Sequence, residues 1–193
     1  MKAKDVYCYY INPDKNTTRR DKIEPMLKGL GFKGLVRVNY NTQQANKVLT
    51  MTSAHLIALG MIKEAELFPA LLLEDDAALM AEFPDLKQEG DLVYLGGSSY
   101  QEGRLGRIRK EHFSDNYFRV YNMLSAHAIL IWDKKGVEII ETAYNMALQI
   151  GDFNDIYLAL FSDKFDFLIP KSGFVFYQDD YTREVTKIKV DDI

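Results

Sequence analysis

Residues Val6–Ile11 read VYCYYI, an aromatic and β-branched run that is typical of a buried strand. The run ends at Asn12-Pro13-Asp14, a turn signal, and Thr18–Leu30 follows with apolar residues at helical spacing. Gly31 stands where a helix C-cap is expected, and Gly34–Asn39 (GLVRVN) predicts a second strand. This strand–helix–strand opening predicts an α/β fold.

The alternation of strands and helices continues to the end of the chain. Pro69–Leu73 (PALLL) is an apolar run of the kind that a sheet buries on both faces. Leu105–Met123 is predicted to be a polar excursion or a hairpin. Further strands are predicted at Asp91–Leu95, Ala126–Trp132, Phe165–Ile169 and Phe174–Tyr177, and further helices at Thr42–Leu67 (one long or two shorter), Gly136–Leu148 and Asp152–Phe161. We therefore expect a Rossmann-type α/β/α sandwich with a mostly parallel mixed sheet.

The length of the chain, 193 residues, predicts a single domain over residues 1–193, since domains commonly hold about 100–200 residues. The formal net charge of -4 argues against a nucleic-acid binder, because such proteins neutralise phosphates with Lys and Arg. The one cysteine, Cys8, excludes an internal disulfide. The start of the chain lacks a signal-peptide pattern, and no apolar run is long enough for a transmembrane segment. We therefore expect a cytoplasmic protein, and the sequence does not indicate its oligomeric state.

Three adjacent carboxylates, Glu74, Asp75 and Asp76, follow directly on the apolar run at Pro69–Leu73. Ligands of open α/β sheets bind outside the carboxyl ends of strands, where these side chains would lie. Like charges this close repel one another, and a divalent cation would relieve the repulsion. Oxygen ligands suit Mn²⁺ or Mg²⁺, which take one or two protein carboxylates and complete their shell with water and phosphate. The alternative is a solvated acidic turn that merely ends a strand.

Short motifs occur in a characteristic order along the chain. They are INPDKNTTRRDKIEPMLKGLGF at Ile11–Phe32, Ser53 with His55, the Leu-Glu-Asp-Asp strand end at Leu73–Asp76, Tyr94–Gly96, Ser125–Gly136, and Asp152–Leu158 followed by Pro170 and Gln178. In this order they resemble the glycosyltransferases of family 25, enzymes of bacterial lipo-oligosaccharide (lipopolysaccharide-type) synthesis and collagen galactosylation. The chain departs from the family pattern between Tyr40 and Ser53 and at Gln101–Tyr121. Such enzymes build their acceptor sites in these regions, so the resemblance does not imply which acceptor this chain uses.

The resemblance implies a GT-A-type fold and the transfer of a hexose from a nucleotide-sugar donor, a UDP-sugar above all, to a glycan or glycoprotein acceptor with inversion. Mn²⁺ or Mg²⁺ would stabilise the negative charge of the leaving diphosphate. Its predicted ligands are Glu74 and Asp76, in an acid-x-acid arrangement, with Asp75 as a close alternative. The predicted donor-binding residues are Asn12, Asp14, Arg19, Arg20, Ser53, His55 and Asp75.

Asp152 and Asp155 are the predicted catalytic residues, as candidates for the general base, because a carboxylate at a helix start can deprotonate an acceptor hydroxyl. Asp152 could instead be only a helix N-cap. Aromatic side chains can cover the apolar faces of sugar rings, and this chain has 12 Tyr. The predicted acceptor contacts are Tyr100, Tyr117, Tyr121 and Gln178.

Other interpretations of the same residues stay open at this point. Arg19 and Arg20 could be exposed helix charges, and His55 could be a hydrogen-bonded residue of the core. A metal-dependent phosphohydrolase could use the same acids. The chain could also be a degenerate, non-catalytic module that binds a nucleotide sugar or a glycan, since it is short for the family.

Overall fold

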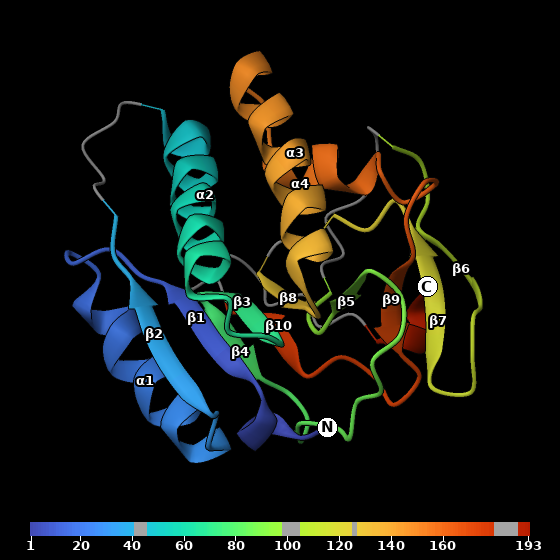
Figure 1. Ribbon diagram of the computed structural model, residues 1–193, viewed down its shortest axis with the longest axis horizontal. Coiled ribbons are helices and arrows are strands. Elements are labelled where there is room, and N and C mark those ends of the chain that lie inside the picture. Colours follow the sequence, from blue (N-terminus) through green and yellow to red (C-terminus); the bar gives the residue numbers. More distant parts are fainter. Residues whose placement is uncertain (41–45, 98–104, 125–126, 180–188) are drawn as a thin grey trace.

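The computed structural model describes residues 1–40, 46–97, 105–124, 127–179 and 189–193. Its main sheet has the strand order β2-β1-β3-β8-β5-β9-β7-β6 (Figure 1). The strands of this sheet are β1 (Tyr7–Ile11), β2 (Gly34–Val38), β3 (Ala70–Glu74), β5 (Leu92–Tyr94), β6 (Arg109–His112), β7 (Tyr117–Tyr121), β8 (Ala128–Ile131) and β9 (Phe167–Pro170).

The direction of the strands confirms a mixed and mostly parallel sheet. Strand β1 pairs in parallel with β2 and β3, and β5 pairs in parallel with β9. Strand β8 is antiparallel to β3 and β5, and β7 is antiparallel to β9 and β6. All strands of this sheet except β7 and β8 therefore run in the same direction. The segment Leu105–Met123, which was predicted to be a polar excursion or a hairpin, contains the hairpin β6–β7.

The helices are α1 (Thr17–Leu30), α2 (Lys47–Ala65), α3 (Lys134–Ile150) and α4 (Asn154–Ala159), with 3₁₀ turns at Ala3–Asp5 and Val190–Asp192. The segment predicted as one or two helices before Leu67 is the single helix α2. Side chains of Asn16, Asn46 and Asp133 accept backbone N–H groups at the starts of α1, α2 and α3. The helix predicted at Asp152–Phe161 is shorter at both ends than expected.

Alternating side chains of the strands build two cores, one on each face of the sheet. Tyr9 and Ile11 of β1 pack in the core that α2 and α3 cover, and these two helices lie side by side (Figure 1). Cys8 and Tyr10 pack in the other core, which α1 covers with Ile23 and Leu27. The chain is thus an α/β/α sandwich, as the sequence predicts, because its central strands are apolar on both faces.

A second, two-stranded sheet lies beside the main one and positions the site. Strands β4 (Ala77–Leu79) and β10 (Phe176–Gln178) pair antiparallel, with Gln178 opposite Ala77. The sequence does not predict β4, and it places the strand at Phe174–Tyr177 without indicating that it pairs outside the main sheet. This pairing brings Gln178 next to the acidic triplet that ends β3.

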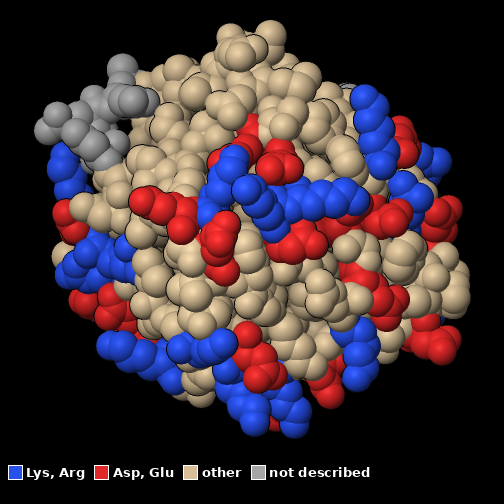
Figure 2. Space-filling model, viewed as in Figure 1, with Lys and Arg blue, Asp and Glu red and all other residues tan. Residues whose placement is uncertain are grey.

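Lys and Arg side chains are interleaved with Asp and Glu across the face shown in Figure 2, so the described residues form no continuous basic stripe there. Within the described ranges, no helix combines the length and apolarity that crossing a bilayer requires.

Candidate functional site

The acidic triplet lies at the edge of the sheet where β1 and β3 both end. The two strands are parallel, and Ile11 is in register with Glu74, so Asn12 and the triplet lie at the same edge. Side chains alternate across a strand, so Glu74 and Asp75 point to opposite faces of the sheet. The three carboxylates therefore have different surroundings and different partners.

Asp75 is held by three side chains on the α1 side of the sheet. Its Oδ2 accepts hydrogen bonds from Asn12 Nδ2 at 2.7 Å and Asn16 Nδ2 at 3.1 Å. Its Oδ1 accepts from Arg19 Nη1 at 2.9 Å. Because both oxygens of this buried carboxylate are bonded to the protein, Asp75 organises the loop after β1 and fixes the guanidinium of Arg19.

Asp76 has one oxygen bonded to the protein and one with no hydrogen-bond partner among the described residues. Its Oδ2 accepts from Gln178 Nε2 at 3.1 Å and from Arg19 Nη1 at 3.5 Å, whereas Oδ1 is buried and unpartnered. Burial, and then the charge of Glu74, raise the pKa of Asp76 to about 7. The Asp179 N–H also donates to the Asp76 carbonyl at 2.7 Å, which fixes the backbone here.

Glu74 is paired with His55 on the opposite face, under helix α2. The His55 Nε2 atom lies 3.2 Å from Glu74 Oε1, and His55 Nδ1 lies 2.9 Å from the carbonyl oxygen of Met51. Burial alone would raise the pKa of Glu74, but the hydrogen bond and charge of His55, with His127 and Arg19, lower it below its usual value. The sequence predicts Glu74 as a metal ligand, and in this structure one of its oxygens is engaged by His55.

The loop after β1 carries a second polar group that includes a residue the sequence analysis missed. Arg37 of β2 donates from Nε to Asn12 Oδ1 at 3.2 Å and pairs with the exposed Asp14. Asn39 Nδ2 donates to Asp14 Oδ2 at 2.6 Å. The hydrogen bond from Arg37 is the main reason that the pKa of Asp14 is lowered. Tyr10 is in parallel register with Arg37, which puts Arg37 beside the end of β1, and no local pattern of the sequence indicates this pairing.

Among the described residues, no hydrogen bond or ion pair joins two further predicted donor residues, Arg20 and Ser53, to the triplet. Arg20 is half-buried on α1, and its charge contributes to lowering the pKa values of Asp14 and Glu24. Ser53 is half-buried on α2. It lies two residues before His55, so its side chain projects about 200° away around the helix and does not share the direction of His55.

The two predicted catalytic aspartates differ in their surroundings. Asp152 accepts the N–H of Phe153 at 2.8 Å, but α4 begins at Asn154 and its N-cap, Phe153, makes no side-chain cap bond. The N-cap alternative for Asp152 is therefore wrong. Asp155 lies in the first turn of α4, and burial raises its pKa to about 6, with Glu74 adding to the shift and His55 opposing it. The fold thus brings Asp155 into the electrostatic reach of Glu74, 81 residues away in sequence.

The predicted acceptor residues are dispersed. Tyr117 is buried, and its hydroxyl donates to the Lys87 carbonyl at 2.7 Å, which does not suit contact with an acceptor. Tyr121 donates to Glu111 at 2.5 Å on the hairpin β6–β7. Gln178 lies at Asp76, as described above, and Tyr100 lies outside the described residues.

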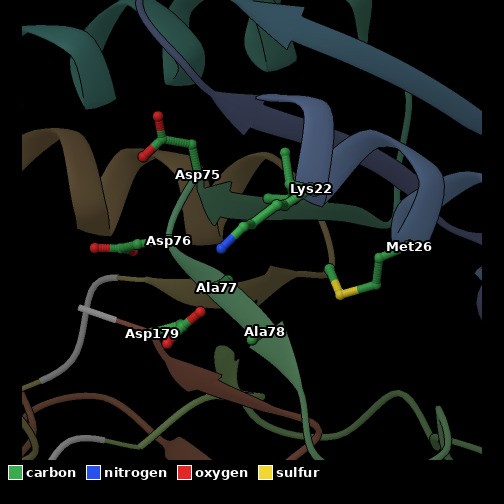
Figure 3. Close-up of a pocket in the computed structure, with 8 residues that line it drawn as sticks. Lys22, Met26, Asp75, Asp76, Ala77, Ala78 and Asp179 are labelled. Carbon is green, nitrogen blue, oxygen red and sulfur yellow. The ribbon is translucent and has the colours of Figure 1, made fainter. Parts of the chain in front are cut away.

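A hollow of about 180 Å³ opens beside Asp76, between α1 and β4. Figure 3 shows Lys22 reaching from α1 toward the segment of Asp76 and Ala77, with Asp179 on the other side of that segment. Its lining residues are Lys22, Ile23, Met26, Asp75, Asp76, Ala77, Ala78 and Asp179. The hollow gives solvent-sized molecules access to the neighbourhood of Asp76.

A metal ion can be tested against these contacts. In the part of the chain that the structure describes, no group of three or more His, Cys, Asp or Glu residues is arranged to hold a metal ion. The buried and unpartnered Asp76 Oδ1 does suit a cation that takes one protein carboxylate and obtains its other ligands from water and phosphate. The described residues therefore offer one carboxylate oxygen at Asp76 to such a cation, and they do not form a cage by themselves.

Comparisons with known proteins leave the family open. No protein-family model matches the chain, and no curated protein matches it. Among solved structures, it is similar to a nucleoside-diphosphate-sugar pyrophosphorylase from Vibrio cholerae RC9, with 12% sequence identity and a TM-score of 0.47 over 83% of this chain and 70% of that one. A likeness this distant carries no argument about function. Membership of the family 25 glycosyltransferases therefore stays a prediction.

Proposed function

We propose that this protein is a glycosyltransferase that moves a hexose from a nucleotide-sugar donor, a UDP-sugar above all, to a hydroxyl of a glycan or glycoprotein. Asp76 Oδ1 would hold Mn²⁺ or Mg²⁺, and the configuration at the sugar carbon would invert. The observation that carries the proposal is Asp76 itself: a buried carboxylate with one open oxygen, next to Arg19 and at the carboxyl end of a central strand.

The donor would lie across the ends of β1 and β3. Arg19 is already fixed by Asp75, so its guanidinium is oriented before any diphosphate arrives. Asp14 in the loop after β1, with Arg37 and Asn39 at the end of β2, offers polar groups where nucleotides commonly bind in such sheets. A bound cation supplies charge stabilisation for the diphosphate as the sugar leaves.

Asp155 would act as the general base. Its pKa of about 6 leaves it mostly ionised near pH 7, yet basic enough to accept a proton from an acceptor hydroxyl. In the transfer, the acceptor oxygen forms the new bond to the sugar carbon and its proton passes to Asp155. The bond between that carbon and the phosphate oxygen breaks, and the nucleoside diphosphate leaves with the bonding pair.

The proposal is tested by measuring the melting temperature of the protein with UDP-, GDP- and dTDP-sugars, each with and without Mn²⁺. A ligand at about 100 times its dissociation constant stabilises a protein by roughly 2.7 kcal/mol, which such a scan detects. We expect a shift with at least one nucleotide sugar, and a larger one with Mn²⁺. No shift and no donor hydrolysis with any of these sugars, or phosphate release from simple phosphate esters instead, would overturn the proposal.

A further inference from the structure

Helix α2 is apolar on every side, although one of its sides faces solvent in the single chain. Between Lys47 and Lys63 it has no Asp, Glu, Lys or Arg, and His55, which lies in this stretch, is buried. On the outer side, Ile57 is 47% exposed and Met61 is 37% exposed. A helix that is apolar all round is ordinarily buried all round, so the outer side of α2 lacks the polar residues of a typical surface helix.

The neighbouring helix α3 extends this surface. The two helices lie side by side over the same face of the main sheet, so their outer sides point the same way (Figure 1). The second half of α3, Thr142–Ile150, also has no charged residue, and Met146 and Ile150 are exposed there. Figure 2 shows a large area over α2 and α3 without Lys, Arg, Asp or Glu, bordered by a band of both charges. We call this area, with Ile57, Met61, Met146 and Ile150, the α2–α3 face, and an exposed apolar area with a polar border marks a contact site.

The charges at the border of the α2–α3 face have both signs. Lys63 of α2 and Glu141 of α3 form an ion pair, with Nζ and Oε2 2.6 Å apart. In a dimer with twofold symmetry the same patch meets itself, so that residue i of one copy contacts residue j of the other, and j contacts i. The charge-free centre then opposes no like charges, and the border can match Lys63 of one copy with Glu141 of the other. The face is therefore complementary to itself.

Other occupants fit this border less well. A helix that lies on a bilayer carries Lys and Arg on its polar side, where they meet anionic headgroups. Here Glu141 stands beside Lys63, and the formal net charge of -4 opposes an anionic surface. A protein partner of one charge sign would leave half of the mixed border unmatched.

The size of the face indicates how strongly two copies would associate. Helices of 19 and 17 residues are about 25–28 Å long, and two packed helices are about 20 Å wide. Their outer sides outline roughly 500 Å², just below the roughly 600–1,000 Å² that each partner of a stable interface buries. We therefore expect a dimer that dissociates on dilution.

We propose that the α2–α3 face is the contact between two copies of this chain, which associate as a dimer with twofold symmetry. The buried side of α2 carries His55, which contacts Glu74, so the second copy covers the helix that backs the acidic triplet. The proposal goes beyond the proposed function and does not depend on it.

Sedimentation equilibrium of the full chain, from about 1 to about 100 µM, measures the association. We expect the wild type to move from the mass of one chain toward twice that mass over this range. Ile57→Glu puts a charge of the same sign from each copy into the apolar contact, so it should raise the dissociation constant about 100-fold or more. Met146→Glu tests the α3 half of the face in the same way. Both side chains are largely exposed in the single chain, so the variants should fold, which circular dichroism checks.

The matched control is Phe113→Glu, because Phe113 is an exposed apolar residue on the hairpin between β6 and β7, outside the α2–α3 face. It should associate as the wild type does. The proposal is overturned if the wild type keeps the mass of one chain at every concentration, or if both variants of the face associate as the wild type does. Flotation of a monomeric wild type with vesicles of phosphatidylcholine and phosphatidylglycerol, lost in Ile57→Glu, would assign the face to a bilayer and also overturn it. Since no sugar nucleotide is used, failure of the proposed function would leave these results as they stand.

Discussion

The Nε2 atom of His55 lies 3.2 Å from Oε1 of Glu74 and ties helix α2 to the end of strand β3. His55 is fully buried and the Glu74 side chain is only 14% exposed, so little water reaches this contact. Removing one partner of a buried pair leaves an uncompensated charge. This pair is therefore the polar contact on the α2 side that fixes where the acidic triplet begins.

We expect His55→Leu to lower the free energy of unfolding by about 3 kcal/mol, since it leaves the mostly buried carboxylate of Glu74 without its partner. Urea denaturation at pH 7 measures the loss. The matched control is Lys63→Met, which breaks the more exposed pair of Lys63 with Glu141 and should cost much less stability. Equal losses in the two variants would contradict a larger contribution of the His55–Glu74 contact to the free energy of unfolding.

Asp155 should make the protein less stable as the pH rises. Its pKa is about 6 in the folded state against 3.8 for the ordinary group, so the folded protein holds this proton more tightly than the unfolded chain does. The stabilisation is present below about pH 4 and is lost as the pH rises through 6, to a total on the order of 3 kcal/mol.

Asp155→Asn should remove that loss and be more stable than the wild type at pH 8, on the order of 2–3 kcal/mol. Thermal or urea denaturation of both proteins from pH 4 to pH 8 measures the difference. Parallel stability curves for the two proteins would contradict the raised pKa.

Gly96 should not tolerate a side chain. A Cβ atom placed there would lie 2.1 Å from Nε2 of the buried His127, so Gly96→Ala should destabilise the protein by about 1–3 kcal/mol or more. Gly60, in the interior of α2, has no atom within 4 Å of such a Cβ, and Gly60→Ala should raise stability by about 0.5–1 kcal/mol. Melting temperatures that move the same way in both variants would contradict this packing.

Asp75→Asn should weaken the fold, because the buried carboxylate accepts from Asn12, Asn16 and Arg19. The expected loss is about 2–3 kcal/mol, since hydrogen bonds to a charged group are among the stronger ones. Urea denaturation measures it, with Asp21→Asn as the control, since Asp21 is exposed on α1. A loss as small as that of the control would mean that the three donors do not depend on the charge of Asp75.

The elements of the fold could be predicted because their apolar patterns are local. The run at Val6–Ile11 is buried on both sides of the sheet, and helices α1 to α3 have polar caps beside a periodic apolar face. Strand β4 could not be predicted, because Ala77 and Ala78 have no strong strand preference and form one only by pairing with β10.

The sequence predicts most residues of the candidate site, but it does not predict which of them contact one another. Strand-end signals place Asn12 and the triplet at one edge of the sheet, as the register confirms. The different surroundings of the three acids depend on contacts with residues that are distant in the sequence. His55 contacts Glu74, and Gln178 donates a hydrogen bond to Asp76. Arg37 was missed because its role arises from the strand beside it, which no local pattern shows.

The rate of nucleoside diphosphate release from a UDP-hexose in the presence of Mn²⁺ tests the central claim most directly. It should be compared in the wild type, in Asp76→Asn and in the surface control Asp21→Asn, with circular dichroism to confirm that each is folded. The account predicts that Asp76→Asn lowers the rate about 100-fold or more while the control matches the wild type, because the substitution removes the carboxylate oxygen that would hold the cation. An unchanged rate in folded Asp76→Asn would contradict it.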